Sequence, residues 1–283
     1  MRGFVFSKEE IMPELPEVEV TMRGIRPEML HEKIKKIWYD DKKLREPFSK
    51  ELHFLEGARI DEVGRRAKYI VVKTAHGSLI IHLGMTGHLS ILKDAQERKK
   101  HDHFEVELED GVIIRYNDAR RFGLIAYLAP DQDPETSRYL KDLGPEPLSE
   151  AFNATYLHNA LKKHQKAVKQ SVMDAAVVVG VGNIYASEVL FLSKIDPRRK
   201  ACSLTFAECE RLVEAIKVTL AHSIEKGGTT IINFQGADGK LGYFVQDLKV
   251  YGHAGEPCKE CGTVIESVLL GQRSTYFCPH CQH

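Results

Sequence analysis

The sequence predicts an α+β protein with three successive parts: a β-rich N-terminal domain that begins with a helix, a helical domain, and a small C-terminal cysteine module. Apolar residues recur first at helical spacing and then in short runs bounded by turn residues. A Gly- and Pro-rich linker then precedes a helical pattern, and two cysteine pairs close the chain. The expected boundaries are 1–11 for an N-terminal tail, 12–142 for the β-rich domain, 143–149 for the linker, 150–249 for the helical domain and 250–283 for the cysteine module.

The composition is that of an ordinary soluble globular protein. Of its 283 residues, 43% are hydrophobic and 28% are charged. No apolar run approaches the roughly 20 residues needed to cross a bilayer. The N-terminus also lacks the apolar core and cleavage site of a signal peptide. We therefore expect a cytoplasmic protein without a membrane partner.

The first expected helix has apolar residues in steps of four, three and four, at Val18, Met22, Ile25 and Met29. Pro16 suits its first turn, where no backbone N–H is needed. Pro27 should end or kink it.

Five short runs predict an antiparallel sandwich or barrel. Tight turns such as His76-Gly77 separate them, and strands joined in this way pair in an antiparallel sense. The runs are Tyr69–Lys73, Ser78–Leu83, His103–Leu108, Val112–Tyr116 and Leu124–Leu128.

Four helical segments follow the linker: Phe152–Leu161, Ala167–Ala175, Ile184–Leu192 and Thr205–Glu225. Asn183 and Thr205 are expected N-caps, because their side chains can accept a backbone hydrogen bond. A glycine-rich loop at 236–242 comes next.

The formal net charge is zero, with 40 basic and 40 acidic residues, which alone argues weakly against a nucleic-acid partner. The charge is uneven, however, because residues 152–200 hold eight basic residues against three acids, a net +5. This basic stripe could bind a polyanion or could be a solvated helix face. Its members are Lys162, Lys163, Lys166, Lys169, Lys194, Arg198, Arg199 and Lys200.

Four of the six cysteines predict a structural zinc site. They form two C-x-x-C pairs separated by sixteen residues: Cys258 with Cys261, and Cys278 with Cys281. Four thiolates at this spacing suit tetrahedral Zn²⁺ and leave no position open for a substrate. The alternative, a pair of disulfides, is typical of exported proteins. Cys202 and Cys209 have no partner at ligand spacing and are expected to be small buried residues.

Further motifs follow one another in a fixed order from residue 12 to the C-terminus. They are Pro13-Glu14-Leu15-Pro16-Glu17, Arg65-Arg66-Ala67-Lys68-Tyr69, His82-Leu83-Gly84-Met85-Thr86-Gly87, Lys100-His101-Asp102-His103, Asp118-Ala119-Arg120-Arg121-Phe122-Gly123, Leu143-Gly144-Pro145-Glu146-Pro147-Leu148, Gly180-Val181-Gly182-Asn183-Ile184-Tyr185-Ala186-Ser187-Glu188, and the cysteine module with Arg273. The ordered set resembles bacterial formamidopyrimidine-DNA glycosylase, an 8-oxoguanine DNA glycosylase. The resemblance implies an N-terminal antiparallel β-sandwich with an N-terminal helix, a helix-two-turns-helix domain and a C-terminal zinc ribbon.

The resemblance also assigns four catalytic residues. Pro13 would supply a secondary amine that attacks C1′ of the sugar and forms a Schiff base, and Glu14 would act as an acid on the sugar ring. Lys68 would serve β-elimination, and Arg273 would assist δ-elimination while it holds a phosphate. Without the resemblance, Pro13 and Glu14 would be an ordinary helix start, and Lys68 and Arg273 surface residues.

An enzyme that acts on a base inside a duplex must flip the base out and fill the gap. The resemblance implies that Met85, Arg120 and Phe122 fill this gap. Without the resemblance, the two apolar residues would be read as part of a core. It assigns DNA contacts to His82, His101, Asn183 and Tyr251, and also to Lys169 on the basic stripe and to His164, where lysine is frequent in the family. The loop at 236–242 is expected to cover the flipped base.

The expected substrate is double-stranded DNA with oxidised purines or abasic sites, bound by a monomer. Leu15, together with Arg120-Arg121-Phe122, favours purines, because the related endonuclease VIII, which prefers oxidised pyrimidines, typically has glycine at the position of Leu15. Three alternatives stay open: an endonuclease VIII-like enzyme, a zinc-ribbon protein without catalysis, and an inactive lesion-binding paralogue.

The N-terminal tail conflicts with this chemistry. In the chain as written, the nitrogen of Pro13 is a tertiary amide to Met12 and has no free lone pair. We therefore expect residues 1–11 to be absent from the active enzyme, with translation from Met12 and removal of that methionine.

Overall fold

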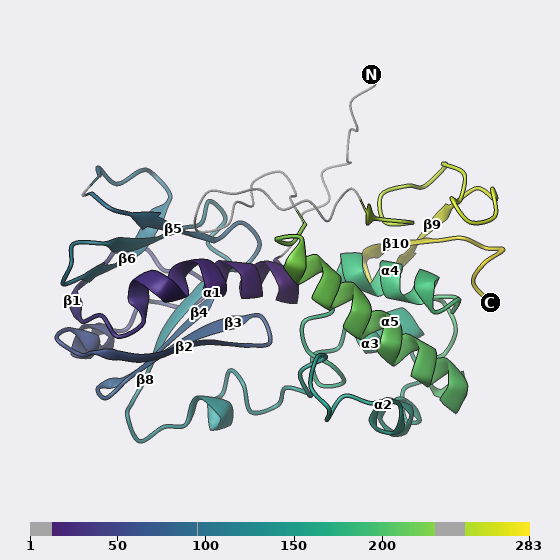
Figure 1. The fold of residues 1–283 in the computed structure, drawn as a ribbon, viewed down its shortest axis with the longest axis horizontal. Helices are drawn as coiled ribbons and strands as arrows, with labels where there is room; N and C mark the ends of the chain where they lie inside the picture. The colour runs from purple at the N-terminus through teal and green to yellow at the C-terminus, as the bar shows by residue number, and fades with distance from the viewer. Residues whose placement is uncertain (1–12, 95, 230–246) are drawn as a thin grey trace. The chain divides into compact units, whose positions relative to one another are not determined.

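The computed structural model describes residues 13–94, 96–229 and 247–283 (Figure 1). Of these, 13–142 and 226–229 form an N-terminal unit, and 143–225 and 247–283 form a helical unit. The expected tail at 1–11 and the glycine-rich loop at 236–242 lie outside the described residues. Among the described ranges, no helix is long and apolar enough to span a membrane.

The N-terminal unit is an antiparallel β-sandwich, as expected. One sheet has the strand order β1-β6-β7-β5 and the other β2-β3-β4-β8. Apolar side chains of both sheets share one core, for example Val106 of β6 and Val72 of β3. The strands are β1 (Ile34–Tyr39), β2 (Ile60–Arg66), β3 (Tyr69–Thr74), β4 (Gly77–His82), β5 (His88–Leu92), β6 (Asp102–Leu108), β7 (Ile113–Asn117) and β8 (Leu124–Leu128), with short 3-10 helices η1 (Lys50–Leu55) and η2 (Pro134–Thr136).

The five predicted runs became strands with ends within one residue of those expected. The three strands of the sandwich that the sequence did not reveal, β1, β2 and β5, all lie at sheet edges. Edge strands place polar side chains outward, which obscures the alternation of apolar residues. In β1 and β2, only the first and fourth residues are buried.

The first helix, α1 (Leu15–Met29), packs against strands of both sheets. Its four expected apolar residues lie in the sandwich core, and Pro16 occupies its first turn. Pro27 was expected to end or kink the helix, and the first alternative is wrong, because the helix continues to Met29, whereas a kink stays a prediction. A proline this close to the end removes only one backbone hydrogen bond, and the N–H of Leu30 still reaches the carbonyl of Arg26 at 2.9 Å.

The helical unit contains α2 (Ala154–Leu161), α3 (Val168–Val172), α4 (Asn183–Leu192), η3 (Ala201–Ser203) and α5 (Phe206–Glu225), followed by the hairpin β9 (Glu266–Leu270) and β10 (Arg273–Phe277). Thr205 caps α5 as expected, since its N–H donates to Glu208 at 2.8 Å and its hydroxyl accepts from the N–H of Glu208 at 3.3 Å. Asn183 is not a cap. It is the first residue of α4, and Gly182 is the N-cap.

Candidate active site and nucleic-acid interface

Buried carboxylates organise the start of α1. Glu14 is the N-cap residue and is 3% exposed, directly after the buried Pro13. The N–H of Glu14 donates to one carboxylate oxygen of Glu17 at 2.9 Å, and the other oxygen accepts from the N–H and hydroxyl of Thr229 at 2.9 and 2.7 Å. Glu17 therefore holds the residue next to the expected nucleophile. No role was predicted for Glu17 from the sequence, although a glutamate three residues after a cap is a known helix-start signal.

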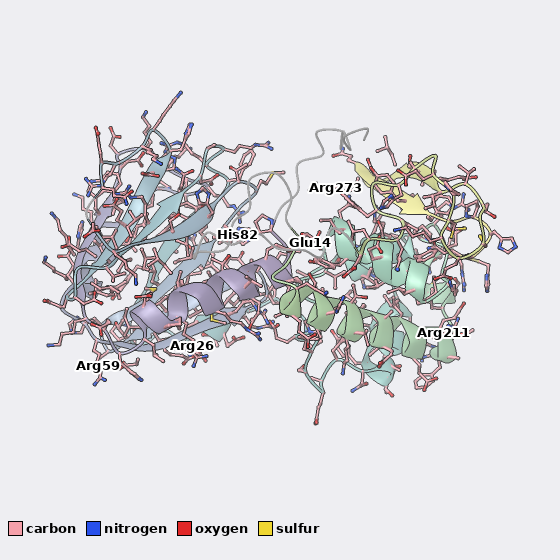
Figure 2. The ribbon with its side chains drawn as sticks, turned by 45° about the horizontal axis from the view of Figure 1, so that its top comes forward. Glu14, Arg26, Arg59, His82, Arg211 and Arg273 are labelled. Carbon is pink, nitrogen blue, oxygen red and sulfur yellow. The ribbon has the colours of Figure 1, made fainter. Side chains whose placement is uncertain are left out.

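Lys68 and His82 are neighbours in the second sheet. Lys68 lies in the two-residue turn between β2 and β3, and its neighbour Tyr69 pairs with His82, the last residue of β4. The rings of Tyr69 and His82 lie 4.8 Å apart. Glu14 and His82 lie at the same end of the N-terminal unit, away from Arg26 (Figure 2).

His82 is neutral and has a defined proton position. Its burial, with the positive charges of Arg45 and Lys68, lowers the pKa of His82 to about 3. Its Nδ1 atom accepts the N–H of Gly84 at 3.0 Å, so the neutral ring carries its proton on Nε2. His82 is therefore an uncharged hydrogen-bond donor beside a lysine.

The three expected gap-filling residues lie on two turns. Met85 is half-buried between β4 and β5, whereas Arg120 and Phe122 lie between β7 and β8. The guanidinium of Arg120 lies 4.8 Å from the centre of the Phe122 ring, which is 45% exposed. Phe122 is thus not a core residue. The carbonyl of His101 accepts the N–H of Asp118 at 2.9 Å, which links His101 to the second turn.

Helix α4 holds two further expected DNA contacts. Asn183 begins the helix, and its buried side-chain carbonyl has no hydrogen-bond partner among the described residues. Glu188, on the same helix, accepts the N–H of Tyr251 at 2.8 Å. The Tyr251 ring packs edge-on against Tyr276, with centroids 5.0 Å apart. Helix α4 therefore carries Asn183 and fixes the backbone of Tyr251, the two residues expected to contact DNA.

Arg273 is exposed at the start of β10. The turn before it, Gly271-Gln272, has two positive φ angles, 56° and 63°, as a two-residue hairpin turn requires. Lys169 is 1% exposed, and its amine donates to the carbonyl of Ser274 at 2.8 Å and to the hydroxyl of Thr275 at 2.9 Å. Lys169 therefore anchors the strand that carries Arg273, and its expected DNA contact stays a prediction.

The basic stripe presents less positive charge than its eight residues suggest. Four members pair with carboxylates: Lys166 with Asp174, Lys194 with Glu260, Arg198 with Asp196 and Arg199 with Glu208. Two of these partners, Glu208 and Glu260, lie outside residues 152–200, so a charge count along the sequence missed them. The half-buried His164 lies beside this stripe, and its carbonyl accepts the N–H of Cys202 at 3.0 Å.

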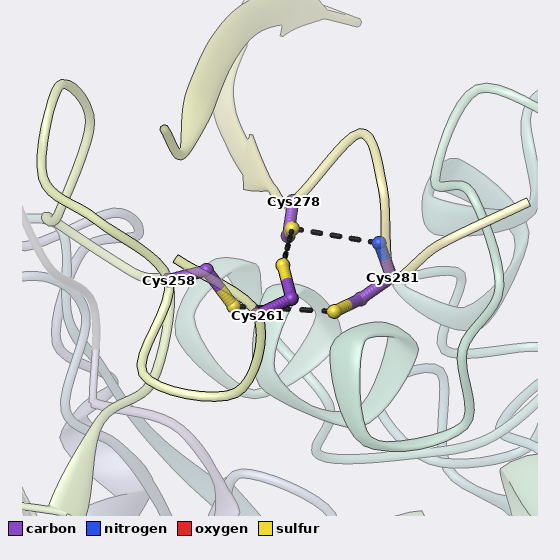
Figure 3. Close-up of side chains that lie close together, drawn as sticks. All are labelled: Cys258, Cys261, Cys278 and Cys281. Carbon is purple, nitrogen blue, oxygen red and sulfur yellow. Dashed lines mark hydrogen bonds between the residues drawn. The ribbon is translucent and has the colours of Figure 1, made fainter. Parts of the chain in front are cut away.

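The four paired cysteines converge on one point (Figure 3). Their sulfur atoms lie within 4.8 Å of one another, with Cys258 and Cys281 separated by 4.0 Å and Cys261 and Cys278 by 3.5 Å. These distances are too long for disulfides, whose bond is about 2.05 Å. A tetrahedron with Zn–S bonds of about 2.3 Å has sulfur–sulfur edges of about 3.8 Å, so the cluster fits zinc.

The remaining two cysteines lie outside this cluster. Cys209 is fully buried as expected, and burial raises the pKa of its thiol to about 11. Cys202 is only half-buried.

Three family models match the chain in order. They are the formamidopyrimidine-DNA glycosylase N-terminal domain over residues 12–125, the formamidopyrimidine-DNA glycosylase H2TH domain over 143–235, and the zinc finger found in FPG and IleRS over 255–283. A protein named formamidopyrimidine-DNA glycosylase from Vibrio vulnificus strain CMCP6 is 49% identical over 271 residues, which span 96% of this chain and 100% of the relative.

Solved structures agree with this match. Lactococcus lactis Fpg in complex with abasic-site DNA has a TM-score of 0.86 at 32% identity, over 95% of this chain and 99% of that one. A structure of MutM with DNA that contains carbocyclic 8-oxo-G also has a TM-score of 0.86, at 34% identity, over 96% and 100%. Motif order, fold and sequence identity thus lead to one conclusion: the chain belongs to the formamidopyrimidine-DNA glycosylase family of DNA-repair enzymes.

Proposed function

We propose that the protein removes oxidised purines, 8-oxoguanine and formamidopyrimidines, from double-stranded DNA and then cuts the strand at the resulting abasic site. The observation that carries the proposal is the buried pair Pro13 and Glu14 at the N-terminus of α1, within a chain that matches the family over nearly its full length. DNA with 8-oxo-G or an abasic site is bound in two similar solved structures. Leu15 favours the purine-directed branch.

Pro13 is the proposed nucleophile. A free α-amino group has a pKa of roughly 7.7–8.0. The positive end of the α1 dipole lowers this value, which increases the neutral, reactive fraction. Because the N–H of Glu14 is held by Glu17, the backbone next to Pro13 has a fixed direction. Fixed placement of this kind lowers the entropic part of the barrier.

The reaction consists of attack on the sugar, opening of the sugar ring, two eliminations and hydrolysis. The Pro13 nitrogen bonds to C1′ as the glycosidic bond breaks, and the base leaves with the bonding electrons and the proton of the amine. The nitrogen lone pair then opens the C1′–O4′ bond, O4′ takes a proton from Glu14, and a cationic Schiff base remains. A general base takes a C2′ proton, and the C3′–O3′ bond breaks to release the 3′ phosphate group. Loss of a C4′ proton then breaks the C5′–O5′ bond and releases the 5′ phosphate group. Hydrolysis of the Schiff base releases Pro13.

Lys68 and Arg273 assist the two eliminations. Lys68 lies on a tight turn beside His82, where its positive charge suits a backbone phosphate or a proton transfer. The exposed guanidinium of Arg273 can hold a phosphate with two hydrogen bonds, which stabilises the leaving group. Neutral His82 adds a donor from Nε2 to a phosphate oxygen without adding charge.

The flipped-out base leaves a gap that Met85, Arg120 and Phe122 fill. The stacked Arg120–Phe122 pair combines an apolar wedge with donors for the unpaired base opposite. Further contacts to the DNA backbone come from His101, His164, Asn183 and Tyr251. Lys169, whose amine is buried on Ser274 and Thr275, acts through the strand of Arg273. One structural zinc ion held by the four clustered cysteines stabilises the hairpin of Arg273, and the protein acts as a monomer.

Borohydride trapping tests the proposal. The protein, with Pro13 as its first residue, is incubated with duplex DNA that contains 8-oxoguanine, a formamidopyrimidine or an oxidised pyrimidine, and borohydride reduces any Schiff base to a stable adduct. We expect an adduct with the two purine lesions and a far weaker one with the pyrimidine. A stronger pyrimidine adduct would indicate an endonuclease VIII-like enzyme. No adduct with any lesion, despite DNA binding, would indicate an inactive paralogue.

A further inference from the structure

The two turns that carry the gap-filling residues touch through their backbones. Gly84, in the first turn, has a φ of +71°. A Cβ atom there would lie 2.4 Å from the backbone nitrogen of Gly123 and 2.5 Å from the carbonyl carbon of Phe122, so only glycine allows this approach. The turn of Met85 therefore packs directly on the turn of Phe122.

A buried carboxylate joins the same two turns. Asp118 is 0% exposed. One of its oxygens accepts the hydroxyl of Thr86 at 2.5 Å and the N–H of Arg120 at 3.2 Å, and the other accepts the N–H of Gly123 at 2.9 Å. The hydroxyl of Tyr116 lies 3.0 Å from the second oxygen and 3.1 Å from the carbonyl of Leu83. Hydrogen bonds to a buried charge are strong, so this cluster is stiff.

Thr86 links the turns through one hydroxyl group. It follows Met85 directly, and its Oγ1 atom donates to Asp118 and accepts the N–H of Arg120 at 3.1 Å. One side chain thus sets the distance between the turn of Met85 and the backbone of Arg120. Thr86 is half-buried, and the two groups that its hydroxyl contacts, on Asp118 and Arg120, both belong to the neighbouring turn.

We propose that Thr86 and Asp118 are positioning residues that join the two turns into one rigid block, so that Met85 and the Arg120–Phe122 pair enter the duplex together at a fixed spacing. This inference rests on the proposed function. Two independent wedges would each lose conformational freedom on insertion, whereas a preformed block has lost it already. The block should therefore matter for extrusion of a paired base and not for later chemistry.

Thr86→Val tests the link, because it keeps the branched shape and removes the hydroxyl. Thr86→Ser keeps the hydroxyl and should behave like the wild type. The matched control is Thr74→Val, which removes the hydroxyl that donates to Gly77 at 3.0 Å in the β3–β4 turn, at the far end of β4. Thr86→Ala is the second variant if valine disturbs folding, and thermal unfolding checks each protein.

The readout is the ratio of two single-turnover rates, for an 8-oxoguanine paired in a duplex and for the same lesion in an unpaired bulge. We expect Thr86→Val to lower this ratio roughly tenfold, while Thr86→Ser and Thr74→Val leave it unchanged. An equal loss on both DNAs, or an unchanged ratio, would overturn the positioning role. A wild-type protein that processes neither DNA would instead refute the proposed function, and the inference with it.

Discussion

The side-chain amine of Lys169 donates a hydrogen bond to the carbonyl oxygen of Ser274, 2.8 Å away, and so fixes the residue next to Arg273. Lys169 lies in the short helix α3, and Ser274 lies in β10 of the hairpin in the cysteine module. Only the folded chain brings them together, 105 residues apart. A buried lysine thus supports the strand that presents an exposed arginine.

We predict that Lys169→Met uncouples strand cutting from base removal. The variant leaves the acceptors on Ser274 and Thr275 without the amine, which costs about 1–3 kcal/mol per buried group, but it also removes a buried charge that is costly to desolvate. The free energy of unfolding should therefore change little. On abasic-site DNA, the ratio of δ- to β-elimination product should fall several-fold because Arg273 is less well placed. Lys163→Met, an exposed lysine nearby, is the control. An unchanged product ratio would mean that Lys169 does not act through Arg273.

The second prediction concerns zinc. Purified protein should contain one zinc per chain, because the four sulfur atoms are already at tetrahedral spacing. Cys258→Ser should lose the metal and weaken DNA binding strongly, while the N-terminal unit stays folded by its own core. Cys202→Ser, outside the cluster, should keep both. Metal analysis that gives well under half an equivalent in unchelated wild-type protein would contradict a structural zinc site.

The third prediction follows from the depressed pKa of His82, about 3 in the folded protein against an ordinary 6.5. Between pH 3 and pH 6.5 the unfolded chain binds more protons at this residue than the folded protein does. The stability that neutral His82 contributes is therefore complete above pH 6.5 and is lost as the pH falls toward 3. His82→Asn keeps an acceptor for the N–H of Gly84 but removes this titration. The slope of the unfolding free energy against pH should therefore decrease by up to about 1.4 kcal/mol per pH unit. Urea titrations between pH 7 and 4 measure this slope. The exposed His76→Asn serves as control, and identical slopes for wild type and His82→Asn would refute the argument.

The sequence predicted the centre of the sandwich better than its margins. The run Tyr69–Lys73 became the inner strand β3, one residue longer at its end, because its buried apolar residues are visible without tertiary context. The run Leu124–Leu128 became β8 with the same ends although β8 lies at an edge, since four of its five residues are buried. The edge strand Ile34–Tyr39 was missed, since its outward lysines hide the pattern.

The same limit applies to the candidate site. Motifs assigned a wedge role to Met85 and Phe122, which stays a prediction, although Phe122 does lie outside the core. They did not reveal that Asp118 joins the two turns, because a hydrogen-bond hub is defined by residues that are distant along the chain. The burial of Lys169 could not be predicted either. A lysine is rarely buried without hydrogen-bond partners, and its partner Ser274 lies 105 positions later in the sequence.

The last prediction concerns the nitrogen of Pro13. In a chain that keeps Met12, this nitrogen is a tertiary amide, and no neighbouring group can make an amide nucleophilic. Two proteins separate the possibilities: one expressed from Met12 so that Pro13 becomes the first residue, and one that keeps residues 1–12. We expect N-terminal sequencing of the first protein to read Pro-Glu-Leu-Pro before the reaction. Borohydride should trap only this protein on DNA with an abasic site, and the trapped protein should be blocked to sequencing because its Pro13 nitrogen is alkylated.

A matched variant controls for the tail itself. Pro13→Gly in the shorter protein keeps a free, primary amine and should still form some adduct, whereas Pro13→Gly in the longer protein should form none. Both longer proteins should still bind DNA if the tail blocks only the chemistry. Trapping of the longer protein at the rate of the shorter one, with residues 1–12 verified as intact by mass spectrometry, would mean that another amine attacks C1′. Lys68 would then be the next residue to replace, because it is the lysine that lies beside His82 in the N-terminal unit.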